Sequence, residues 1–213
     1  MSAPVYFISG IDTGIGKTYT TGYLAKLWNE QGQKTITQKL IQTGNTDISE
    51  DIEQHREIMG IGWFAEDHSK LTMPEIFSYP ASPHLATQID GREIDFQKIA
   101  DATQQLAEKY DLVLLEGAGG LMVPLTTDLL TIDYIAEKKF PVILVSSGRL
   151  GSINHTLLSL EALKIRGLAL YALAYNLNDE SQDALISQDT AAYLKAYLAQ
   201  HFPKALWIDI PVL

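Results

Sequence analysis

The residues best suited to chemistry begin with a glycine-rich stretch at positions 10–18, which reads GIDTGIGKT. It follows an apolar run and precedes a run of good helix formers. Glycines let backbone N–H groups turn toward a phosphate, Lys17 can neutralise phosphate charge, and the Thr18 hydroxyl suits Mg²⁺. The strict motif spacing would place a glycine where the chain has Ile11. The sequence therefore predicts a variant P-loop between a strand and a helix.

A second candidate group ends an apolar run in the middle of the chain. Residues 112–115 are followed by Glu116-Gly117-Ala118-Gly119-Gly120. In open α/β sheets, ligands bind beyond the carboxyl ends of the strands, so we expect Glu116 beside the P-loop and within reach of Mg²⁺. The glycines allow backbone to approach a ligand, although a flexible turn at a strand end would use them equally well.

Lys39 ends another run of strand-forming residues and is followed by Thr43 and Gly44. Spacing alone fits two interpretations equally. The lysine either faces the same crevice as the P-loop or is a solvated strand end.

Strands and helices must alternate to bring these groups together. Apolar runs typical of buried parallel strands occur at residues 5–9, 35–39, 112–116, 142–146 and 168–176. Helical periodicity occurs at residues 18–31, 96–110, 153–166 and 183–201. Residues 60–92 are less periodic, and we interpret them as loop with short helices. The pattern predicts one α/β domain over residues 1–213, a doubly wound P-loop NTPase with a mostly parallel sheet and helices on both faces.

Composition narrows the class of partner. The formal net charge of −10 disfavours nucleic acid and anionic membranes, so small-molecule substrates are expected. The chain has no cysteine, which excludes disulfides and thiol nucleophiles. The first residues lack a basic segment followed by a long apolar one, which predicts a cytoplasmic protein.

Taken together, the P-loop, the Lys39 and Glu116 segments and two further motifs resemble dethiobiotin synthetases. The further motifs are Pro80-Ala81-Ser82-Pro83-His84 and Leu150-Gly151-Ser152-Ile153-Asn154-His155. The resemblance implies ATP-dependent closure of a ureido ring on 7,8-diaminononanoate with CO₂, which gives dethiobiotin, ADP and phosphate. It also implies Mg²⁺ as cofactor, and a homodimer with the active site at the subunit interface.

The same resemblance implies a set of site residues. The catalytic residues would be Lys39, Lys17 and Thr13. Magnesium would be held by Thr18, Asp51 and Glu116. The substrate would contact Thr43, Leu150, Gly151, Ser152, Ile153 and Asn154. ATP would contact Gly14, Ile15, Gly16, Lys17, Thr18, Tyr19, Asp51, Glu116, Gly117, Ala118, Gly119, Asn176, Ile210, Pro211 and Val212.

Several assignments have alternatives. Asp51 and Glu50 also fit a second interpretation, as first-turn acids that complement a helix dipole, and Asp47 is a competing metal ligand. Asn176 fits a strand-terminating residue as well as an adenine contact. The chain also departs from the family pattern at Leu40 and Gln42, and at Gly14, where relatives are often acidic.

Two other functions compete with the enzyme. A ParA-like partitioning ATPase shares the fold, but such proteins carry an additional lysine early in the P-loop, and residues 9–14 contain none. A nucleotide-sensing module without turnover would keep the P-loop but would have no need of Lys39.

Overall fold

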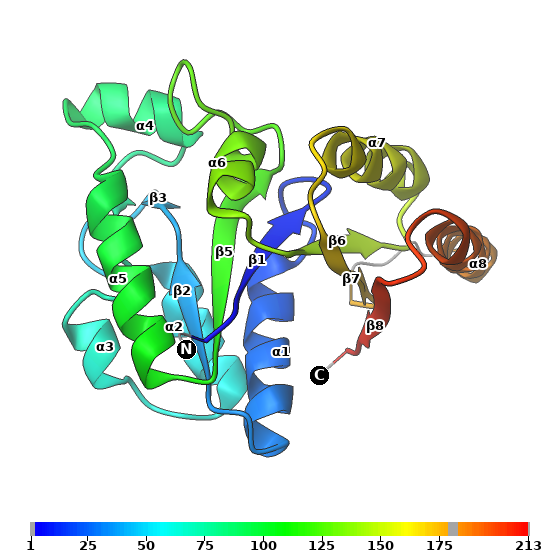
Figure 1. Cartoon of the computed structure of the whole chain (residues 1–213), viewed down its shortest axis with the longest axis horizontal. Helices are drawn as coiled ribbons and strands as arrows, with labels where there is room; N and C mark the ends of the chain where they lie inside the picture. The colour runs from blue at the N-terminus through cyan, green and yellow to red at the C-terminus, as the bar shows by residue number, and fades with distance from the viewer. Residues whose placement is uncertain (1–2, 179–182, 213) are drawn as a thin grey trace.

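The computed structural model describes residues 3–178 and 183–212. Within that part of the chain, the central sheet has six strands in the order β2-β5-β1-β6-β7-β8, and every neighbouring pair is parallel (Figure 1). The strands are β1 (Val5–Gly10), β2 (Thr35–Lys39), β5 (Leu112–Gly120), β6 (Val142–Ser147), β7 (Leu170–Asn176) and β8 (Leu206–Ile210). The prediction of an α/β fold with a mostly parallel sheet is confirmed.

Helices cover both faces of this sheet. They are α1 (Lys17–Glu30), α2 (Glu50–Met59), α3 (Ala65–His68), α4 (Pro83–Asp90), α5 (Phe96–Lys109), α6 (Thr131–Lys138), α7 (Ser152–Ile165) and α8 (Ala184–His201). In Figure 1, α5 lies on one side of β5 and α1 on the other. Of the helices described, none combines the length and the apolar composition needed to cross a bilayer.

Alternating strand residues contribute to different hydrophobic cores, of which the described residues form three. Phe7 and Leu115 belong to the core that includes residues of α5, α6, α7 and α8, whereas Ile8 and Leu114 pack with Leu24 of α1. Successive side chains of a strand point to opposite faces, so a strand covered on both faces must be apolar throughout. This explains the nearly continuous apolar runs in the sequence.

The structure differs from the sequence predictions in several elements and at a few element boundaries. All four predicted helices and the short helices within residues 60–92 are present, but α2, α6, β8 and a two-stranded sheet were not among the predicted elements. The small sheet pairs β3 (Gln42–Thr43) with β4 (Ile76–Phe77). The strand β7 starts at Leu170 instead of residue 168, because the Leu168 N–H still bonds to the carbonyl of Leu163 in α7 (3.0 Å).

Candidate active site

The P-loop lies between the end of β1 and the start of α1, where the N-terminal N–H groups of a helix face an incoming anion. Gly16 has a φ of 93°, and a Cβ at this position would come within 2.2 Å of Asn176 Nδ2. That amide donates to the Ile15 carbonyl (3.0 Å). Only glycine fits at position 16, and Asn176 lies against the P-loop backbone, at the end of β7.

Four predicted residues meet where β2 ends beside Glu116 of β5. The Thr18 hydroxyl donates to Asp51 (2.7 Å) and lies 3.2 Å from Glu116 Oε1. The Lys39 ammonium donates to Glu116 Oε1 (2.8 Å) and to the Gly117 carbonyl (3.2 Å), and it forms an ion pair with Asp51. The lysine is buried and therefore faces the crevice; it is not a solvated strand end.

Burial and charge compete at these groups, and charge prevails at two of them. Burial disfavours the ionised form of Glu116, but the charge of Lys39 and a hydrogen bond from His55 hold the pKa of the carboxyl well below its usual range. Burial also opposes the charge on Lys39, yet Glu116 and Asp51 raise the pKa of the lysine. For Lys17, burial prevails over the attraction of Glu116 and lowers the pKa. Lys39 and Glu116 are thus both ionised at neutral pH.

The oxygen ligands present fit Mg²⁺ bound together with a phosphate. Among the described residues, no three His, Asp or Glu side chains form a metal site by themselves. Mg²⁺ usually takes one or two carboxylates plus substrate phosphates, and it keeps several waters. Thr18, Asp51 and Glu116 supply a hydroxyl and two carboxylates in one place, and both carboxylates already contact a cation, Lys39. Asp47 instead pairs with Lys70 at the surface.

A pocket of about 430 Å³ adjoins this cluster. Thr13 of the P-loop and Thr43 of β3 both line it, beside Ala118 and Gly119. Its other walls are Pro80, Ala81, Ser82, Pro83 and Val123. The structure therefore places the Pro80–Pro83 motif opposite the P-loop, and a small molecule in this pocket would lie beside the nucleotide phosphates.

The predicted substrate segment 150–154 lies at the start of α7. Gly151 has a φ of 97°, Leu150 is 83% exposed, and Arg149 ties the segment to the P-loop through Asp12 (2.8 Å). None of the five residues lines the Thr43 pocket within the described chain. In the described part of the chain, Thr43 and the segment 150–154 therefore do not share the lining of this pocket.

The predicted adenine contacts gather beside the start of α1. The strand β8 pairs with β7 so that Ile210 lies opposite Asn176. The Tyr19 hydroxyl donates to the Pro211 carbonyl (2.8 Å), and Val212 is 61% exposed. These residues therefore lie together next to the P-loop, where Asn176 and Ile210 are buried and Val212 is exposed.

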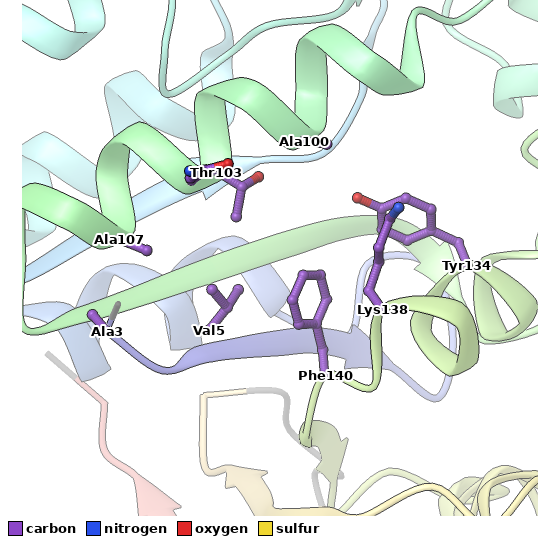
Figure 2. Close-up of a pocket in the computed structure, with 9 residues that line it drawn as sticks. Ala3, Val5, Ala100, Thr103, Ala107, Tyr134, Lys138 and Phe140 are labelled. Carbon is purple, nitrogen blue, oxygen red and sulfur yellow. The ribbon is translucent and has the colours of Figure 1, made fainter. Parts of the chain in front are cut away.

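A separate pocket of about 310 Å³ lies between α5, α6 and the start of β1 (Figure 2). Val5, Ala107 and Phe140 line it, and Lys138 lies over the Tyr134 ring at one end. Val5 is the first residue of β1, whereas the P-loop follows the last one. This pocket is therefore not part of the nucleotide site.

Sequence reasoning missed two residues that touch the site. His55 is fully buried and bonds to Glu116 Oε2 (2.8 Å), and Arg149 binds Asp12. A signal for His55 was present, because it follows Asp51 by four residues and so lies on the same face of α2. Arg149 directly precedes a motif that the sequence analysis had already singled out.

Comparison with known proteins places the chain in one family. A family model described as an AAA domain matches residues 5–202. An ATP-dependent dethiobiotin synthetase BioD 2 of Pasteurella multocida is 51% identical over 205 residues, which cover 96% of each chain. The BioD protein of Chlorobaculum tepidum is 51% identical over 211 residues, 99% of this chain and 88% of its own.

Solved structures show the same fold at low identity. Chloroplast FtsY from Physcomitrella patens matches with a TM-score of 0.54 and 16% identity, over 97% of this chain and 57% of its own. A FlhF complexed with GMPPNP and Mg²⁺ matches with a TM-score of 0.54 and 17% identity, over 98% of this chain and 65% of its own. Each of these likenesses shows the fold alone.

The parallel sheet and the glycine loop with its Lys17 and Thr18 define a P-loop NTPase. Its curated relatives are about half identical over nearly the whole chain. The chain belongs to the family of ATP-dependent dethiobiotin synthetases.

Proposed function

We propose that this enzyme uses ATP to carboxylate 7,8-diaminononanoate with CO₂ and to close the ureido ring of dethiobiotin, a step of biotin biosynthesis. One observation carries the proposal at the level of chemistry. The buried Lys39 ammonium shares its carboxylate partners, Asp51 and Glu116, with Thr18 of the P-loop, and Thr13 of the same loop lines a pocket with Thr43.

The reaction needs concentrated positive charge, because a carbamate and the γ-phosphate of ATP are both anionic. A carbamate is a poor electrophile. Transfer of the γ-phosphoryl onto it gives a mixed anhydride, which the neighbouring amine attacks with release of phosphate. We assign Lys17 and Lys39 to the transferring phosphoryl group, and Thr43 to the substrate amine.

Mg²⁺ would be held by Thr18, Asp51 and Glu116, and when bound it would neutralise the phosphate oxygens. The protein's own part is to hold the hydroxyl of Thr18 and the carboxylates of Asp51 and Glu116 close together. Thr18 already bonds to one carboxylate and lies beside the other, so little reorganisation is needed.

We further propose a cytoplasmic homodimer of single-domain subunits. The segment 150–154 has the N-terminal N–H groups of α7, which suit a carboxylate. Because this segment does not line the Thr43 pocket of its own chain, we assign it to the substrate carboxylate of the partner subunit's site.

The alternatives are not favoured. The curated relatives are named as synthetases, and no lysine lies within residues 9–14, where a ParA-like ATPase carries one. A sensor without turnover would not need a buried lysine between two carboxylates, since burying charge is costly.

The test is incubation with 7,8-diaminononanoate, bicarbonate and Mg·ATP. We expect diamine-dependent ADP release and a cyclic urea detected by mass. Lys39→Gln should lower the rate by about 10²–10³-fold, as for loss of one transition-state charge partner, while ATP still binds. Lys34→Gln is the matched control, because Lys34 lies at the other end of β2 on the surface.

Two results would contradict the proposal. Wild-type protein that releases no ADP in response to the diamine is not this enzyme. A Lys39→Gln variant with unchanged turnover would remove Lys39 from the chemistry and favour the sensor.

A further inference from the structure

His55 connects the site to a buried polar network on α2. The side chain is fully buried, and both of its ring nitrogens are engaged. Its Nε2 lies 2.8 Å from Glu116 Oε2, and its Nδ1 lies 3.0 Å from the hydroxyl of Thr37 on β2. A leucine would fill the same space without these bonds, so packing alone does not explain a histidine here.

The direction of the hydrogen bonds follows from Glu116. Its carboxyl is ionised and can only accept, so His55 Nε2 is the donor to Oε2. The Thr37 hydroxyl accepts from Arg56 Nη1 (2.8 Å) and has its own proton to give to His55 Nδ1. This assignment is made from the network.

Arg56 is itself held in place. Its guanidinium makes two bonds to Asp67, of 2.9 Å and 2.8 Å, and Asp67 also accepts from Thr72 (2.7 Å). The three side chains are buried. The bonds thus run from Arg56 through Thr37 and His55 to Glu116, and Arg56 also donates to Asp67. No member of this network is exposed.

The two oxygens of Glu116 have different partners. Oε1 faces Lys39 and Thr18, whereas Oε2 faces His55. Among the described residues, His55 is the donor recorded for Oε2. A carboxylate held by one oxygen alone can rotate, and a second bond fixes the direction of the first oxygen.

We propose that His55 is a positioning residue, which holds Glu116 so that Oε1 points at the magnesium of bound Mg·ATP. The inference rests on the proposed function for its metal. Outer partners of metal-binding carboxylates orient the ligand, and their loss typically weakens metal affinity or activity about 10–100-fold.

Two amide substitutions test the role of the single donor. The Gln amide of His55→Gln reaches about as far as Nε2 and can still donate to Glu116. The shorter amide of His55→Asn reaches only the position of Nδ1. We expect His55→Asn to bind Mn²⁺, as a probe in the presence of ATP, about 10–100-fold more weakly than wild type by electron paramagnetic resonance. His55→Gln should regain most of the affinity.

His55→Leu and Thr103→Val serve as comparisons. His55→Leu removes both bonds and should behave like His55→Asn. Thr103 is a buried hydroxyl on α5 that bonds to Gln38, away from the metal residues. Thr103→Val should lower the melting temperature without changing Mn²⁺ affinity, which separates metal positioning from general stability.

The inference fails if His55→Asn binds Mn²⁺ in the presence of ATP as wild type does, or if His55→Gln is as defective as His55→Asn. If His55→Leu does not fold, the comparison of His55→Asn with His55→Gln still tests the inference. Failure of the proposed function would look different, because wild-type protein would then bind Mn²⁺ and ATP but form no cyclic urea.

Discussion

Asp51 contacts two side chains of the site, Thr18 and Lys39, and also stabilises the helix α2. It lies in the first turn of α2, where Ser49 caps the helix and a negative charge complements the dipole. The same carboxylate accepts from Thr18 and pairs with Lys39. A role in helix stability and a role in the site are therefore compatible in one side chain.

We expect Asp51→Asn to raise the Mg²⁺ concentration needed for half-maximal ADP release by about tenfold or more, because fewer ligand charges weaken metal binding. The measurement is the initial rate as Mg²⁺ is varied at saturating ATP. Asp47→Asn is the control, since Asp47 lies only four residues away but pairs with Lys70 at the surface. Equal Mg²⁺ dependence in the two variants would exclude Asp51 from the metal site.

The convergence of Lys39 and Glu116 with the P-loop was predictable because each group ends an apolar run typical of a parallel strand, although β5 itself continues from Glu116 to Gly120. The carboxyl ends of such strands share one edge of the sheet, so position in the sequence fixes position in space. The contacts of His55 were not predictable in the same way. Spacing places His55 and Asp51 on one face of α2, but only packing against the sheet decides what that face meets.

Among the helices and strands, too, some were predictable from the sequence pattern and others were not. Long apolar runs such as Val142–Ser147 indicate buried strands, and the bounds of these strands were predicted to within a few residues. The edge strand β8 has an exposed Leu206 and a polar Asp209, so its sequence lacks the buried pattern. The two-residue strands β3 and β4 are too short for any periodicity.

The short helix α3 is held to α2 by one buried ion pair. Arg56 and Asp67 are both almost fully buried, and burial disfavours an ionised Asp67, yet its bonds to Arg56 lower the pKa of the carboxyl. Breaking a buried pair leaves an uncompensated charge. We expect Asp67→Asn to lower the free energy of unfolding by about 3 kcal/mol at pH 7.

The pH dependence of this loss has a definite sign. A carboxyl whose pKa is lowered by folding stabilises the protein above its unfolded value, about 3.9, and loses this effect as the pH falls through the folded value. Urea unfolding should therefore show a constant difference between wild type and Asp67→Asn from neutral pH down to about pH 5, which shrinks below about pH 4. A difference that grows in acid would contradict this account of the pair.

At the scale of the whole molecule, the net charge is negative, and the positive charge at the site comes from a few groups. The chain carries a formal charge of −10, and Lys17 and Lys39 lie near the carboxylates of Asp51 and Glu116 beside the P-loop. Attraction of an anionic substrate thus depends on these few groups and on helix termini. The start of α7 is such a terminus, but it lies outside the Thr43 pocket of its own chain, which is why we assign it to the partner subunit.

A mixture of two inactive variants tests whether the active site is shared between subunits. Lys39→Gln removes the lysine that we assign to the transferring phosphoryl group. Asn154→Asp adds a negative charge to the first turn of α7, which the helix dipole tolerates but a substrate carboxylate does not.

If the α7 segment serves the partner's site, each mixed dimer has one intact site and one with both defects. Random exchange of subunits at equal concentrations should then restore about a quarter of the wild-type ADP release. If the segment serves its own chain, every site in the mixture carries a defect and no activity returns. Sedimentation of the wild-type protein provides the control for dimer formation, and a dimer without restored activity would place the segment in its own subunit's site.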